Sequence, residues 1–98
     1  MDKYIEVPSV GEILFEEFME PMGISAYKLA KDINVPTSRI QDILHGRRKI
    51  SADTSVRLGA YFNVSYEYFM NMQTDIDIRN AKVALEEELA KIPSSQYT

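Results

Sequence analysis

Apolar residues recur at intervals of three and four along most of the chain, the spacing that puts them on one face of an α-helix. The first such helix is predicted to begin at Ser9, and its apolar positions are Val10, Ile13, Leu14 and Phe18. Ser9 and Glu12 fit a capping box, in which each side chain accepts a hydrogen bond from the other residue's backbone amide. Pro21 and Gly23 are predicted to end this helix.

Two short helices are predicted next. Ser25 begins the first of them, which closes at Asn34, a residue that tolerates the left-handed backbone conformation. The second begins near residues 36–38 and ends at Gly46. Their apolar positions are spaced for a shared core, and these are Leu29, Ile33, Ile40, Ile43 and Leu44.

The rest of the chain continues the helical pattern. Ser51 begins a fourth helix that closes at Asn63, and its candidates for the core are Val56, Leu58, Ala60 and Tyr61 or Phe62. A fifth helical region begins at Ser65. It either stops near residue 73 or runs through 73–75 into a C-terminal helix that ends at 92–93. No alternation of apolar and polar residues indicates a strand, so we predict an all-α protein.

Length and composition exclude several classes of protein. The 98 residues suffice for one modest core. The chain has no cysteine, which excludes disulfides and thiolate zinc sites, and its single histidine excludes the usual multi-histidine metal sites. We expect no metal, no other cofactor and no small-molecule substrate. No long apolar run and no signal-peptide core are present, so we expect a cytoplasmic protein with no membrane partner.

The net charge of −4 hides a basic segment. Residues 1–21 carry a net charge of −5, residues 51–73 carry −1 and residues 74–98 carry −2, whereas residues 22–50 carry +4. A negative total argues mildly against nucleic acid as a partner. The basic segment, however, coincides with the two short helices, and affinity for phosphate requires such a local concentration of charge.

The segment from Ala26 to His45 has the pattern of a helix-turn-helix. Asn34 suits the turn, and Val35 can plug it. The residues left outward on the second helix are polar and can reach base edges in a major groove, and these are Thr37, Ser38, Arg39 and Gln41 or Asp42. The basic run 47–49 follows directly, where contacts to the DNA backbone are expected. The alternative is a plain helical corner with a solvated basic loop.

Several stretches of the sequence carry a resemblance to a known family. They are residues 11–25 (GEILFEEFMEPMGIS), 34–36 (NVP), 45–54 (HGRRKISADT), 57–58 (RL) and 65–73 (SYEYFMNMQ). The chain resembles the HigA (VapI-like) antitoxins of type II toxin–antitoxin systems, within the lambda-repressor and Cro (XRE-like) group. The resemblance implies a five-helix DNA-binding domain in a small dimeric repressor that binds palindromic operator DNA in its own operon. It also implies neutralisation of a HigB toxin, a RelE-like, ribosome-dependent nuclease that cleaves mRNA.

The resemblance further implies which residues meet the DNA. The positions that match base-facing residues are Thr37, Ser38, Arg39, Gln41 and Asp42. The positions that match phosphate-contacting residues are His45, Arg47, Arg48 and Lys49. One departure is Ala26, where lambda-type domains often have a glutamine that grips phosphate, and Lys28 is the candidate to replace that contact.

An apolar stripe with helical spacing follows residue 77, and it consists of Ile78, Ala81, Leu85, Leu89 and Ile92. The stripe either packs against its own domain or pairs two copies of the chain, as a twofold repressor needs. We favour pairing through Ile78, Ala81, Leu85 and Leu89. The predicted organisation is therefore a DNA-binding domain over residues 1–73 and a C-terminal helix and tail for dimerisation over residues 74–98.

Two interpretations of the acidic first helix stay open. Glu16 and Glu20 either form a solvated face or imitate the charge of nucleic acid toward a basic toxin. Phe15 and Met19, four residues apart, either anchor that toxin-binding surface or belong to the core.

Nothing in the sequence supports catalysis. His45 has no partner nucleophile and no metal-ligand set, and neighbouring glutamates such as Glu16 and Glu17 point about 100° apart on a helix. We therefore predict no catalytic residue and no enzyme. The alternative to an antitoxin is a free-standing, phage-type transcriptional repressor without a toxin partner.

Overall fold

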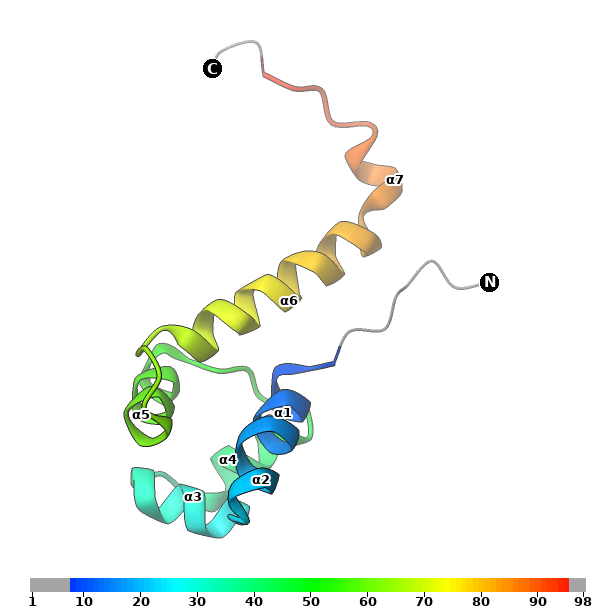
Figure 1. The fold of residues 1–98 in the computed structure, drawn as a ribbon. Helices are drawn as coiled ribbons and strands as arrows, with labels where there is room; N and C mark the ends of the chain where they lie inside the picture. Colours follow the sequence, from blue (N-terminus) through cyan, green and yellow to red (C-terminus); the bar gives the residue numbers. More distant parts are fainter. Residues whose placement is uncertain (1–7, 96–98) are drawn as a thin grey trace.

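The computed structural model describes residues 8–95, and every regular element in that range is helical (Figure 1). The first helix is continuous but divides into α1 (Val10–Ile13), a π-helical segment η1 (Leu14–Met19) and α2 (Glu20–Met22). It is followed by α3 (Ala26–Ile33), α4 (Thr37–Leu44), α5 (Ala52–Phe62), α6 (Tyr68–Ala84) and α7 (Glu86–Leu89). The predicted all-α fold with five helices, here α1–α2 as one and α3 to α6, is confirmed, and the short α7 extends it.

The helices begin and end where local signals predict. The capping box is present, because Ser9 Oγ accepts from the Glu12 amide at 3.1 Å and Glu12 Oε1 accepts from the Ser9 amide at 2.8 Å. Ser25 and Ser51 cap α3 and α5 with a single hydrogen bond each, in which the serine side chain accepts from the backbone amide three residues later. The left-handed residues that close helices are Gly23, Asn34 and Asn63, with φ of 67°, 62° and 60°.

One core lies between the helices, and its buried side chains come from α1, η1 and α3 to α6, together with Ile50. Its largest fully buried members are Leu14, Met19, Leu29, Ile40, Ile43, Leu58 and Phe69. Phe18 packs its ring 5.1 Å from that of Phe62 and 5.0 Å from that of Phe69, measured between centroids, which ties the first helix to α5 and α6. Because the first helix also contacts α4 and α5 also contacts α3, these ring contacts connect the pair α3 and α4 to the rest of the fold.

The core face of α5 differs from the prediction. Val56 and Ala60 are exposed, whereas the small residues Thr54, Ser55 and Gly59 are buried beside Leu58. The reason is the close approach of the segment after α5, whose backbone at Ser65 lies within 2.6 Å of the position a Cβ on Gly59 would take. Only small residues fit on that face of α5, so the spacing of apolar residues does not predict which face is buried.

The π-helical segment decides which side of the first helix is buried. A π-helix bonds each amide to the carbonyl five residues back, as the amide of Glu20 bonds to Phe15. Leu14 and Met19, five residues apart, therefore face the core together, and Met19 is only 1% exposed. Of the two interpretations left open for Met19, a surface anchor or a core residue, the structure shows the core residue. Phe15 remains 43% exposed.

The C-terminal helix resolves the question of continuity. α6 runs through residues 73–75 without a break, and its last buried side chain is Ile76. It breaks at Leu85, where φ is −101° and ψ is 13°, so the helix does not continue unbroken to residue 92. Figure 1 shows the end of α6 and α7 projecting away from the other helices. Within residues 8–95, no helix combines the length and apolarity that a membrane span requires.

Candidate nucleic-acid interface

The turn between α3 and α4 has the geometry of a helix-turn-helix. Asn34 takes the left-handed conformation, and the Val35 amide then donates to the Ala30 carbonyl at 3.0 Å. Val35 is half-buried and packs against the core, as predicted for a plug. Ala30 is buried between the helices. The two helices are therefore fixed relative to each other by the turn itself.

The outward face of α4 is polar. Ile40 and Ile43 point into the core, which leaves Ser38, Gln41 and His45 exposed at intervals of three and four residues. Thr37 is half-buried at the first position of the helix. Their hydroxyl and amide groups can both donate and accept hydrogen bonds, as base edges in a major groove require.

His45 lies at the end of this face. Its Nδ1 is 2.8 Å from the Gln41 carbonyl oxygen, and because a carbonyl only accepts, Nδ1 carries the hydrogen. This contact fixes the ring at the C-terminal end of α4. The side chain is exposed there, beside the loop that carries the basic run.

Asp42 and Arg47, both expected to meet DNA, bind each other. Arg47 donates to Asp42 Oδ1 from Nη2 at 3.0 Å and from Nε at 3.2 Å, and its amide donates to the Asp42 carbonyl at 2.7 Å. The pair folds the loop back over the last turn of α4. Asp42 therefore meets a base only if it gives up part of its contact with Arg47.

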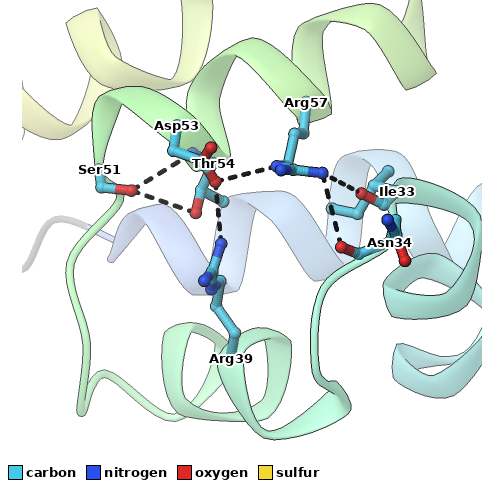
Figure 2. Close-up of polar contacts among 7 residues, drawn as sticks. All are labelled: Ile33, Asn34, Arg39, Ser51, Asp53, Thr54 and Arg57. Carbon is cyan, nitrogen blue, oxygen red and sulfur yellow. Dashed lines mark hydrogen bonds and ion pairs between the residues drawn. The ribbon is translucent and has the colours of Figure 1, made fainter.

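Arg39 points from α4 toward α5 rather than outward (Figure 2). Its Nη1 donates to Asp53 Oδ2 at 2.9 Å, and its Nε is buried without a partner. Arg57 Nε donates to the same Asp53 oxygen at 2.9 Å, while Arg57 Nη1 donates to the Ile33 carbonyl at 2.8 Å. Hydrogen bonds from Arg57 and then from Arg39 hold the pKa of Asp53 below its ordinary value. The prediction that Arg39 reads a base does not match this orientation.

Lys28, at the start of α3, is paired within its own helix. Its Nζ lies 3.0 Å from Asp32 Oδ2, and the Tyr61 hydroxyl donates to the same oxygen at 2.8 Å. Hydrogen bonds from Lys28 and then Tyr61 lower the pKa of Asp32, and the bond to Asp32 raises the pKa of Tyr61. Lys28 stays exposed, so a phosphate can compete for it.

The loop after α4 is anchored to α6. Lys49 Nζ lies 2.7 Å from Asp77 Oδ1, and Gln73 Nε2 donates to that oxygen at 3.1 Å. Gln73 Oε1 in turn accepts from the Ile50 amide at 3.3 Å. Arg48 lies between Arg47, which binds Asp42, and Lys49. Its side chain is exposed and has no acid at ion-pair distance among residues 8–95.

The residues predicted for protein contacts divide by exposure. All four of the predicted pairing seam are exposed on the projecting end of the molecule: Ile78, Ala81, Leu85 and Leu89. On the first helix Phe15, Glu16 and Glu20 are exposed, whereas Met19 is not. Asp53 and Arg57 are two of the polar residues of the site that the sequence did not single out. Their i,i+4 spacing was the available signal.

Known proteins resemble this chain in both sequence and fold. A helix-turn-helix family profile (HTH_3) matches residues 15–69. Virulence-associated protein I of Dichelobacter nodosus is 46% identical over 79 residues, which cover 79% of this chain and 73% of that protein. Antitoxin HigA-1 of Vibrio cholerae is 31% identical over 80 residues, covering 82% and 75%.

A solved structure extends the likeness to almost the whole chain. It is the antitoxin HigA of Pseudomonas aeruginosa with the higBA promoter, with a TM-score of 0.84 and 32% identity. The superposition covers 93% of this chain and 99% of that one. The chain therefore belongs to the helix-turn-helix family that includes the HigA antitoxins and virulence-associated protein I.

Proposed function

We propose that this chain is the antitoxin of a type II toxin–antitoxin pair and represses its own operon as a sequence-specific DNA-binding dimer. The observation that carries the proposal is the exposed polar face of α4, fixed on a helix-turn-helix. The likeness to a HigA antitoxin bound to promoter DNA supports it. Two recognition helices would enter successive major grooves about 34 Å apart.

In this proposal Ser38 and Gln41 read bases because they are exposed on the outward face of α4. Thr37 joins them from the first position of the helix, where it is half-buried. A glutamine amide can make two hydrogen bonds to one adenine edge. Asp42 contacts a base when its carboxylate gives up hydrogen bonds from Arg47 and accepts one from the base instead. His45 and the basic loop hold the phosphates, and Lys28, Arg47 and Lys49 exchange their acidic partners for phosphate oxygens.

Replacing one residue of each kind tests the DNA interface. Gln41→Ala should lower affinity for the operator by about 1–3 kcal/mol and relax the preference at one base pair. Arg48→Ala should weaken all DNA about equally and reduce the slope of log affinity against log salt by about 1. Lys82→Ala, an exposed cation on α6, is the matched control. Equal losses on operator and random DNA for Gln41→Ala would rule out base reading by that residue.

Neutralisation of a HigB/RelE-like toxin by direct binding is the second part of the proposal. Phe15 supplies an exposed apolar group among the acidic residues Glu16, Glu17 and Glu20, a surface suited to a basic protein. Size-exclusion chromatography with the product of the adjoining reading frame tests it. Co-elution that is lost in Phe15→Glu supports the proposal, whereas failure of the wild-type chain to co-elute favours a free-standing repressor.

A further inference from the structure

We propose that Asp53 is a positioning residue for DNA recognition, which fixes the start of α4 against α5 and the end of α3 through Arg39 and Arg57. This inference rests on the proposed DNA-binding function. It assigns Arg39 a role through Asp53 rather than through a base.

One carboxylate oxygen connects three helices. Asp53 Oδ2, in the first turn of α5, accepts from Arg39 on α4 and from Arg57 on α5 at 2.9 Å each. Arg57 also donates to the carbonyl of Ile33, the last residue of α3, at 2.8 Å. Ser51 caps α5 by accepting from the Thr54 amide, so the turn that carries Asp53 is itself held in place (Figure 2). Both arms of the helix-turn-helix are therefore tied to one group.

The Arg39 side chain is committed to this arrangement. It is only 27% exposed, and its Nε is buried with no hydrogen-bond partner, so its guanidinium is turned into the protein. A carboxylate held in one place stabilises such a partly buried cation through a charge-assisted hydrogen bond, although Asp53 itself is 56% exposed. The first turn of α4 gains from the contact because Pro36, its N-cap, makes no side-chain capping bond.

Movement of this turn would matter for recognition. Ser38 and Thr37 are the immediate neighbours of Arg39 and lie on the part of α4 that reaches bases in the proposed function. Hydrogen bonds to base edges tolerate only small displacements of their donors and acceptors. Loss of the Asp53 carboxylate would also leave two guanidinium groups facing each other without an acid.

The test is a double-mutant cycle with Asp53→Asn, Arg39→Met and the two combined. The probe is a duplex of the DNA preceding the chain's own reading frame, compared with a shuffled duplex. Each single variant should lose about fivefold or more in affinity for the first duplex, and the double variant should lose little more than the worse single variant. Asp53→Glu, which retains the carboxylate, should recover most of the affinity. Asp75→Asn is the control. It breaks an exposed i,i+4 pair with Arg79 on α6, as Asp53→Asn breaks the i,i+4 pair with Arg57, and it should not lower the affinity for DNA.

Other outcomes overturn the inference. If Asp53→Asn binds as tightly as the wild type or more tightly, while Arg39→Met loses preference at a single base pair, then Arg39 reads a base directly. If the affinity losses of Asp53→Asn and Arg39→Met simply add in the double variant, the two residues act independently and Asp53 does not position Arg39. Hydrogen exchange of the DNA-free protein gives an independent reading, because Asp53→Asn should speed exchange in α4 and Asp75→Asn should not. If the wild type fails to distinguish the two duplexes, the proposed sequence-specific recognition of this DNA is ruled out. Unchanged exchange in α4 of Asp53→Asn would separately reject the positioning role of Asp53.

Discussion

At the scale of single residues, the structure depends on small polar side chains in the core. Ser55 is buried in α5, where its hydroxyl donates to the Tyr66 carbonyl at 2.7 Å and accepts from the Met70 amide at 3.0 Å. It thereby joins α5 to the start of α6. The pattern of apolar residues cannot predict that Ser55 is buried, because its role is to hydrogen-bond backbone groups 11 and 15 residues later in the chain.

We predict that Ser55→Ala destabilises the fold. The change removes two part-buried hydrogen bonds and leaves the Tyr66 carbonyl and the Met70 amide without this partner, which costs about 1–3 kcal/mol in the free energy of unfolding. Urea denaturation measures this cost, with Ser94→Ala, at an exposed position, as the control. Equal stability of the two variants would show that these hydrogen bonds contribute nothing.

We also predict that acid destabilises the protein through Asp53 and Asp32. Both carboxyl groups have pKa values lowered by hydrogen bonds, from Arg57 on Asp53 and from Lys28 on Asp32. A group whose pKa is lower in the folded chain than in the unfolded chain stabilises the fold above its ordinary pKa. That stabilisation is lost as pH falls toward the folded value.

Denaturation midpoints between pH 7 and pH 3 measure the effect. Stability should fall as the pH drops through about 4, and it should fall less in Asp53→Asn and Asp32→Asn than in the wild type. The exposed Asp75→Asn serves as the control. An identical pH dependence in all four proteins would contradict the assigned pKa directions.

At the scale of elements, α4 is held from three sides. Gly11 brings α1 against its last turn, Asp53 holds its first turn from α5, and Gln73 of α6 anchors the loop that follows it. A Cβ at Gly11 would collide with the Ile43 carbonyl oxygen and lie 3.0 Å from the Leu44 Cα. The sequence indicates neither of these close approaches.

We therefore predict that Gly11→Ala displaces α4. The clash is with backbone, which yields less readily than a side chain, so the cost is about 1–3 kcal/mol of stability together with a loss of DNA affinity. Gly59→Ala is the matched control, because its Cβ would lie 2.6 Å from the Ser65 carbonyl oxygen, remote from α4. Calorimetry and DNA titration on both variants separate the effects. A loss of DNA affinity as large in Gly59→Ala would contradict the role of Gly11.

The elements themselves were largely predictable because their signals are local. Ser9, Ser25 and Ser51 begin helices, and Asn34 and Asn63 end them, all through contacts within a few residues. The π-helical segment was not predictable, and it is what buries Met19. The directions of Arg39 and Lys49 were likewise hidden, since each is set by an acid on a distant helix.

At the scale of the whole molecule, the described residues divide into packed helices and a C-terminal end with exposed apolar side chains. Beyond Ile76 no described side chain of α6 or α7 is buried. Three of the exposed side chains there are large and apolar, and these are Ile78, Leu85 and Leu89. Exposed apolar groups gathered in one region are typical of an interface. The location supports the prediction that two chains pair through the C-terminal segment.

We predict that Leu85→Glu combined with Leu89→Glu makes the protein monomeric without unfolding it. Charge at the centre of an apolar interface is costly, whereas the same side chains contribute little to the monomer core. Sedimentation equilibrium measures the mass. Val56→Glu is the control, since Val56 is 46% exposed on α5 and Leu85 is 47% exposed. A dimer that survives the double change would place the interface elsewhere.

The net charge of the molecule is misleading until it is divided along the chain. The segment of residues 22–50, with its charge of +4, contains both helices of the helix-turn-helix and the loop after them, whereas the acidic segments lie outside it. We infer that this part of the chain recognises a particular DNA sequence. Titration of the full chain with the duplex preceding its own reading frame, against a shuffled duplex at about 0.15 M salt, tests it most directly. We expect binding at least about a thousandfold tighter to the first duplex. Equal affinity for the two duplexes would show that the chain does not recognise this DNA sequence.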